Sequence, residues 1–209
     1  MTIKNSANHS FSTWKILFLS IGFLGICLFT VFTGVEKTFA AADVSPHVAA
    51  SQQVELGHVQ KLILPDALAL PVVQQPEGDA SFVSGQDGQL TEFGLASQYG
   101  NVGLLAHNHL AGRSFPQIAF GQEIQVMYTD GHIETFIVTE ILQYQALEPD
   151  SPWSSFRSLS DNSVMSASQM FRRVYTGDHH VTLQTCIDAE GDASWGRLFI
   201  LAVPKTTES

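Results

Sequence analysis

The sequence predicts an all-β domain: a closed barrel or sandwich of about eight short strands, with one or two short helices, preceded by a transmembrane helix. Three observations lead to this fold class. From about residue 61 onward, short apolar runs recur between turn signals. Helical spacing is confined to a short segment near residue 170. A single long uncharged run, residues 16–35, lies near the N-terminus.

The uncharged run is long enough to cross a bilayer, since it would span ~30 Å as a helix. Lys4 and Lys15 precede it and favour an N-terminus on the cytoplasmic side. Ala40-Ala41-Ala42 resembles a signal-peptide cleavage site, so an anchor and a cleaved signal both remain open. Either reading puts the remainder outside the cytoplasm. The expected parts are a cytoplasmic segment 1–15, a signal anchor 16–35, a stalk 36–60, a folded domain 61–204 and a tail 205–209.

Strands are expected wherever an apolar or alternating run is bounded by turn residues. The hairpin turn Asp130-Gly131 separates an alternating run from its return strand. Residues 167–175 are expected to form one short helix, ended by Gly177. The expected strands are Leu62–Leu64, Ala69–Val73, Val102–Ala106, Ile124–Thr129, His132–Leu142, Val181–Ile187 and Leu198–Val203.

The charge balance makes nucleic acid an unlikely partner class. Beyond residue 42 the chain carries 7 Lys and Arg against 19 Asp and Glu, which repels phosphate backbones. The chain has two cysteines, and Cys27 lies inside the uncharged run. No structural disulfide is therefore expected with Cys186. A single free thiol outside the cytoplasm is a candidate nucleophile, and a buried core cysteine is the alternative.

The strand that ends at Cys186 suggests how the thiol is presented. Side chains alternate along a strand, so Thr182, Gln184 and Cys186 share one face, opposite the face of Val181 and Leu183. If Val181 and Leu183 face the core, the thiol points outward. A thiol needs a basic neighbour to act as a nucleophile at neutral pH. His107 ends an apolar run, and Arg197 returns beside Cys186 if the last two strands pair.

Four segments resemble the sortase family of cysteine transpeptidases. His107, Cys186 and Arg197 occur in the family's order, with Cys186 79 residues after His107 and Arg197 11 residues after Cys186. The resemblance covers roughly residues 60–204. The segments are Thr182-Leu183-Gln184-Thr185-Cys186, Leu104-Leu105-Ala106-His107-Asn108, Gly196-Arg197-Leu198-Phe199-Ile200, and the hairpin Phe115…Gly121-Gln122-Glu123-Ile124…Asp130-Gly131.

The resemblance implies a thioester mechanism on an eight-stranded barrel. Cys186 would attack a Leu-Pro-x-Thr-Gly-like sorting signal of secreted surface proteins, and His107 would act as general acid and base. Arg197 would hold the substrate or its oxyanion. An amine of the cell wall or of another protein would release the acyl group. We expect no cofactor and no metal, and a single-pass protein whose catalytic domain lies on the extracytoplasmic face.

Three residues are expected to contact the peptide: Thr182 and Gln184, which share the face of the thiol, and Ala106. Many sortases carry glycine where this chain has Ala106, so the extra methyl group is expected to narrow the groove. Among the remaining histidines, His109 is expected in a surface loop, and His179-His180 are expected to be solvated turn residues.

Two alternatives remain open from the residues alone. One is a metal-binding barrel, in which His107, His109, Cys186 and a histidine from 179–180 would form a zinc site. The other is a catalytically silent barrel that binds peptides.

Overall fold

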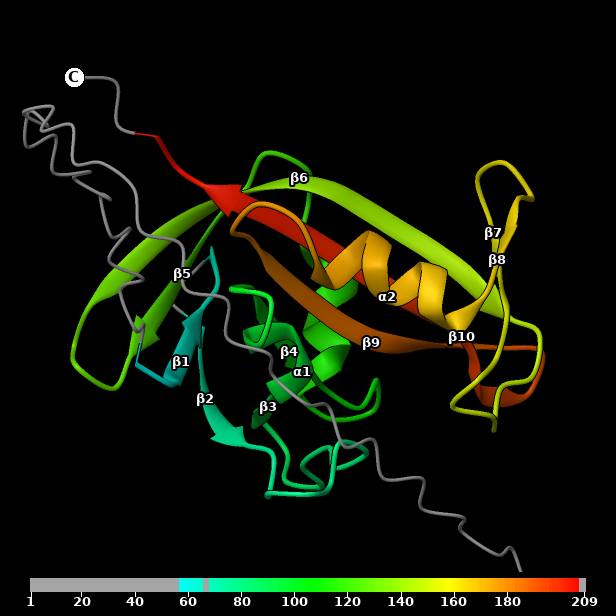
Figure 1. Ribbon diagram of the computed structural model, residues 1–209, viewed down its shortest axis with the longest axis horizontal. Helices are drawn as coiled ribbons and strands as arrows, with labels where there is room; N and C mark the ends of the chain where they lie inside the picture. The colour runs from blue at the N-terminus through cyan, green and yellow to red at the C-terminus, as the bar shows by residue number, and fades with distance from the viewer. Residues whose placement is uncertain (1–56, 66–67, 207–209) are drawn as a thin grey trace, which may run out of the picture. The chain divides into compact units, whose positions relative to one another are not determined.

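The computed structural model describes residues 57–65 and 68–206, which form the folded domain (Figure 1). The predicted anchor 16–35 and most of the stalk lie outside these residues, so both stay predictions. In the part of the chain that is described, no helix has the length and apolar character that a membrane span needs.

The described residues contain ten strands in one sheet, and eight of them close into a barrel. The barrel order is β10-β9-β4-β3-β2-β1-β5-β6, and β6 pairs back with β10. β7 and β8 continue the sheet beyond β6, outside this ring. The strands are β1 (Val59–Ile63), β2 (Ala69–Gln74), β3 (Leu90–Glu92), β4 (Val102–Leu105), β5 (Glu123–Tyr128), β6 (Ile133–Ala146), β7 (Phe156–Ser158), β8 (Val164–Met165), β9 (Val181–Ala189) and β10 (Asp192–Pro204).

The predicted closed barrel is confirmed, and it is a mixed one. Most neighbouring strands are antiparallel, but β2 pairs with β3 and β4 pairs with β9 in parallel. Three short strands, β3, β7 and β8, were not predicted, because two or three residues are too few to show an alternation of apolar and polar side chains. The helix α1 (Gly94–Ser97) and the 3-10 helix η2 (Ala111–Gln117) were not predicted either, because one has only four residues and the other is not an α-helix and contains Pro116.

The β5–β6 hairpin forms as its alternation predicts. Ile124, Val126 and Tyr128 are fully buried in the barrel core, while the residues between them are partly exposed. Gly131 closes the turn at φ +86°, a conformation that glycine adopts without strain. The Asp130 carboxylate accepts from the backbone N–H of His132 at 2.8 Å and fixes the return strand.

Helix α2 (Ala167–Tyr175) spans the predicted residues 167–175 and covers the outer face of β9 and β10 (Figure 1). A capping box starts it: the Ser166 hydroxyl accepts from the N–H of Gln169, whose side chain accepts from the N–H of Ser166. Its buried face joins a second apolar cluster outside the barrel. That cluster consists of Ala96, Tyr144, Met170, Val174, Tyr175, Phe199 and Leu201.

Candidate active site

Cys186 lies on β9 between two neighbouring strands that each bring one of the predicted residues. On one side β10 runs antiparallel, and Arg197 is the direct partner of Cys186 in the register. Directly opposed residues of an antiparallel pair project to the same face, so the thiol and the guanidinium share one face of the sheet. Cys186 and Arg197 are both half-buried.

On the other side of β9, the parallel strand β4 leads to His107. Leu105 pairs with Gln184, and the next residue, Ala106, donates its N–H to the carbonyl of Gln184 at 3.1 Å. The carbonyl of Ala106 accepts from the Thr185 hydroxyl at 2.9 Å. The chain therefore leaves β4 and reaches His107 beside Cys186, so Cys186 and Arg197 come from two paired strands and His107 from the segment that follows a third.

Arg197 is held by backbone carbonyls and by no carboxylate among the described residues. Its Nη1 donates to the carbonyls of Ser194 at 2.8 Å and of Gly196 at 2.9 Å. Its Nη2 donates to the carbonyl of Pro149, in the β6–β7 loop, at 3.4 Å. A guanidinium has five N–H donors, so Nε–H and one Nη2–H remain for a ligand. Because no ion pair of the described chain includes Arg197, its charge is not offset by a bound carboxylate.

The second histidine, His109, is exposed in the loop after β4, as expected. Its ring centroid lies 5.5 Å from that of His107. Between them, Asn108 turns toward the β9–β10 hairpin and donates from Nδ2 to the carbonyl of Ala193 at 2.9 Å. The loop that carries both histidines is thereby attached to the strand pair that carries Cys186 and Arg197.

The three predicted peptide-contacting residues are largely engaged within the protein. Thr182 is fully buried under α2, and its hydroxyl donates to the carbonyl of Val174. Gln184 is half-buried and accepts from the Tyr175 hydroxyl. Ala106 is 6% exposed and belongs to the barrel core. The predicted alternation on β9 holds, but α2 covers much of the face that was expected to be open, and peptide contact by these residues stays a prediction.

Burial accounts for the behaviour of two tyrosines near this face. Desolvation raises the pKa of Tyr175 above its usual range, so its hydroxyl is a donor to Gln184 throughout the physiological range. Tyr144, the partner of Arg197 on β6, also has its pKa raised, mainly by burial. Neither side chain is available as an anionic base.

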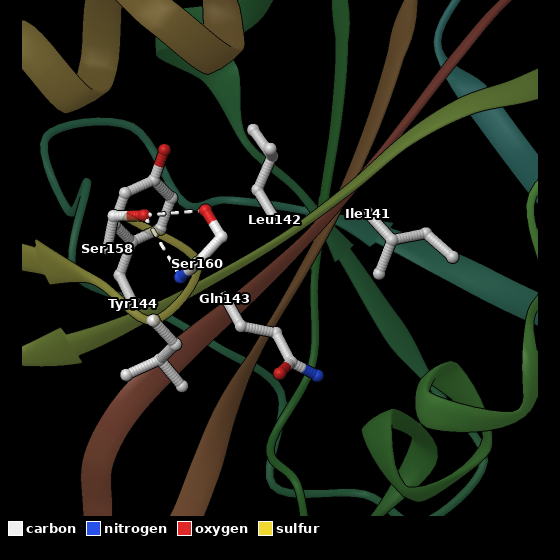
Figure 2. A pocket seen from close by; sticks show the side chains of 7 residues that line it. Ile141, Leu142, Gln143, Tyr144, Ser158 and Ser160 are labelled. Carbon is white, nitrogen blue, oxygen red and sulfur yellow. Dashed lines mark hydrogen bonds between the residues drawn. The ribbon is translucent and has the colours of Figure 1, made fainter. Parts of the chain in front are cut away.

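Among the described residues, hollows lie along β6 and in the β6–β7 loop, and no sequence pattern indicated either of them. One is a cleft of about 210 Å³ along β6, where the hydroxyls of Ser158 and Ser160 bond to each other at 2.9 Å (Figure 2). The other lies in the β6–β7 loop, which Arg197 contacts through Pro149. The residues around the cleft are Ile141, Leu142, Gln143, Tyr144, Ser158, Leu159 and Ser160, and those around the loop hollow are Glu148, Pro149, Asp150 and Ser151.

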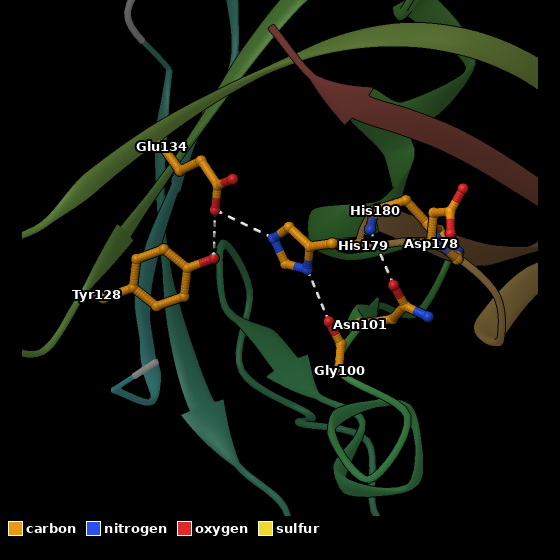
Figure 3. A network of polar contacts seen from close by, with 7 residues as sticks. All are labelled: Gly100, Asn101, Tyr128, Glu134, Asp178, His179 and His180. Atoms are coloured by element: carbon orange, nitrogen blue, oxygen red, sulfur yellow. Dashed lines mark hydrogen bonds and ion pairs between the residues drawn. The ribbon is translucent and has the colours of Figure 1, made fainter. Parts of the chain in front are cut away.

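His179 and His180 belong to a polar network before β9, so the expectation that they are solvated turn residues was wrong for His180. His180 is 8% exposed, and its ring nitrogens face the carbonyls of Asp178 at 2.7 Å and Val174 at 2.9 Å. His179 lies between Glu134 and the carbonyl of Gly100 (Figure 3). Packing of α2 onto β9, which the sequence pattern does not reveal, buries His180.

The zinc-site alternative is not supported by this arrangement. His179 and His180 lie at the start of β9, whereas Cys186 lies near its other end. In residues 57–65 and 68–206, no three His, Cys, Asp or Glu side chains are grouped as a metal site. The predicted ligand set is therefore not brought together.

Comparison with known proteins gives similarity at the level of fold. No family model and no curated protein matches the chain. The solved structures that resemble it include sortase C1 of Streptococcus agalactiae, with 17% identity, a TM-score of 0.44, and coverage of 71% of this chain and 69% of the other. Sortase C from Clostridium perfringens SM101 is 14% identical at a TM-score of 0.45, covering 73% of this chain and 72% of the other.

A Clostridium perfringens sortase D5 transpeptidase is 14% identical at a TM-score of 0.44, with coverage of 70% of this chain and 78% of that one. All three identities are low and all three TM-scores are below 0.5.

Proposed function

We propose that this protein is a cysteine transpeptidase that cleaves a Leu-Pro-x-Thr-Gly-like peptide through a thioester on Cys186. The observation that carries the proposal is the register around Cys186: Arg197 is its direct partner on β10, and the end of β4 delivers His107 on its other side. A thiol, an imidazole and an uncompensated guanidinium on adjacent strands are the groups that acyl transfer to a thiol requires.

In the first half-reaction, Cys186 as a thiolate attacks the carbonyl carbon of the substrate threonine while His107 carries a proton, and the carbonyl oxygen becomes an oxyanion. Arg197 donates to this oxygen from the two N–H groups that its backbone contacts leave free. His107 gives a proton to the nitrogen of the leaving glycine, and the C–N bond breaks. The products are a threonyl thioester and a peptide with a free amino group.

In the second half-reaction, an incoming amine attacks the thioester carbon. Arg197 again stabilises the oxyanion, and His107 accepts the proton that the amine loses. The C–S bond breaks, so the thiolate of Cys186 and the protonated His107 are restored, and a new amide forms. Because His107 gives one proton and takes one back, the cycle is balanced without any redox partner.

The cellular setting belongs to the same proposal. The uncharged run 16–35 would hold the protein in the membrane with the barrel on the extracytoplasmic face. There it would meet sorting signals of secreted proteins and an amine of the wall or of another protein. The acidic balance of the domain is compatible with a cationic amine as acceptor.

The test is peptide cleavage and transfer by the full-length protein in detergent. A panel of Leu-Pro-x-Thr-Gly peptides with a labelled amine acceptor is incubated with the protein, and cleaved and transferred products are separated by mass. Wild type and Cys27→Ala are expected to form both products, and Cys186→Ala neither. Equal turnover by Cys186→Ala at unchanged melting temperature would contradict the proposal.

A further inference from the structure

The peptide backbone around His107 is held at three polar atoms: the N–H and the carbonyl of Ala106, and the carbonyl of His107. The N–H of Ala106 donates to the carbonyl of Gln184 at 3.1 Å, and the carbonyl of Ala106 accepts from Thr185 at 2.9 Å. The carbonyl of His107 then accepts from the N–H groups of Leu110 at 3.0 Å and Gly112 at 3.1 Å. The Ala106 bonds attach the histidine's backbone to β9 at the two residues that precede Cys186.

Thr185 supplies the one side-chain bond in this set. It is 2% exposed, and its hydroxyl has the Ala106 carbonyl as its acceptor. Ala106 lies one residue beyond the end of β4, where regular strand pairing stops. The hydroxyl of Thr185 therefore extends the attachment between β4 and β9 as far as the residue before His107.

Gly112 lies where the loop after His107 returns toward Thr185. A Cβ atom at this position would lie 2.3 Å from Oγ1 of Thr185 and 2.8 Å from the carbonyl oxygen of His107. Real Cβ atoms do not approach other atoms so closely, so only glycine lets the loop return this near to the histidine. Glycine is therefore required at position 112, because this residue lies against the hydroxyl of Thr185 and the carbonyl of His107.

We propose that Thr185 is a positioning residue, which acts with Gly112 to fix the backbone of His107 beside Cys186. This inference rests on the proposed function, because it gives Thr185 its effect through the catalytic use of His107. Thr185 itself is buried and meets no reacting atom. A misplacement of about 1 Å in a catalytic group can cost roughly 100-fold in rate, so loss of one well-placed bond here has a large kinetic consequence.

Thr185→Val is the direct test, because valine keeps the shape and removes only the donor. We expect kcat to fall about 10- to 100-fold with KM changed less than threefold, since a misplaced acid affects the transition state more than peptide binding. Thr185→Ser keeps the hydroxyl and is expected to restore kcat to within about threefold of wild type. Unchanged kcat in Thr185→Val, or no rescue by serine, would overturn the proposal.

Repeating the Thr185→Val substitution in the His107→Ala variant separates a positioning role from a general loss of stability. If Thr185 acts through His107, then Thr185→Val added to His107→Ala lowers kcat by less than about twofold further, because the two residues act as a unit. An equal further loss would mean that Thr185 works independently. The matched control is Thr91→Val, a fully buried threonine on β3 whose hydroxyl accepts from the N–H of Ser84. It is expected to lower the melting temperature and leave kcat unchanged.

Backbone hydrogen exchange tests the attachment independently of activity. In Thr185→Val, the amides of Leu110 and Gly112 are expected to exchange at least tenfold faster than in wild type and in Thr91→Val. Unchanged exchange overturns the inference even if turnover falls. If the wild-type protein turns over no peptide, the proposed function fails, and this exchange measurement alone then decides whether Thr185 holds the loop.

Discussion

Replacing Arg197 by lysine separates the charge of this residue from its hydrogen-bonding geometry. Nη1 uses both of its N–H groups on the carbonyls of Ser194 and Gly196, and Nη2 uses one on Pro149. The guanidinium of Arg197 thereby keeps two N–H groups for the oxyanion while its other three donate to backbone carbonyls. Lysine has three N–H groups on a single nitrogen and cannot serve both sets at once.

The magnitude follows from the donor that lysine would lose. Removal of one oxyanion donor costs roughly 10²–10³-fold in rate, or about 2.7–4 kcal/mol of transition-state stabilisation. We therefore expect Arg197→Lys to lower kcat/KM by about 100-fold or more. The effect should fall mainly on kcat, because the oxyanion exists only in the transition state and the intermediate that follows it.

Steady-state cleavage of a fixed peptide by the full-length protein measures this effect, with thermal melts to check the fold. The matched control is Arg157→Lys, an exposed arginine on β7 that donates to Gln145 at 3.4 Å. Exposed substitutions of this kind change stability by less than about 0.5 kcal/mol, so the control is expected to be silent. Turnover by Arg197→Lys within threefold of wild type would show that only the charge matters, and the oxyanion role would be refuted.

Three other predictions concern the histidines, the packing of β4 and the membrane segment. His107→Ala should lower kcat by ~10²–10⁴-fold, and His109→Ala by less than about tenfold; equal losses would refute a single catalytic histidine. Gly103→Ala puts a Cβ 3.0 Å from Tyr175, Phe93 and Ala96, so calorimetry should give a melting temperature lowered by several degrees, from about 1–3 kcal/mol of overpacking. Protease added to intact cells should digest the chain beyond residue 43, and full protection would contradict an extracytoplasmic domain.

The strands that could be predicted are those whose alternation is strong and whose ends carry turn residues. The β5–β6 hairpin and helix α2 were predicted because each has a signal in neighbouring residues. For the hairpin it is the turn pair Asp130-Gly131, and for the helix it is the helical spacing of residues 167–175. The capping box formed by Ser166 and Gln169 is a further local start signal, which the prediction of this helix did not include. Closure of the barrel through β6 and β10 depends on pairing of distant residues, so the strand pattern alone left a closed barrel and a sandwich both open.

The catalytic roles of His107, Cys186 and Arg197 stay predictions, and the structure describes where these residues lie. The order of His107, Cys186 and Arg197 in the sequence suggested their meeting, and the register of β4, β9 and β10 brings their backbones together. The burial of Thr182 under α2 could not be predicted from the sequence of β9. Alternation of side chains shows which residues share a face of the strand, but it does not show which element packs on that face. The attachment of Thr185 to Ala106 joins residues 79 positions apart, and no local pattern signals it.

The most direct measurement of the central claim is the mass of the protein during turnover. A Leu-Pro-x-Thr-Gly peptide added to the full-length protein without an amine acceptor should produce a species heavier by the acyl fragment that ends in threonine. Hydroxylamine should remove that mass, as it does for a thioester, and peptide mapping should locate it on Cys186. Absence of the adduct from active wild-type protein, or an adduct that persists in Cys186→Ala, would contradict a thioester mechanism at this residue.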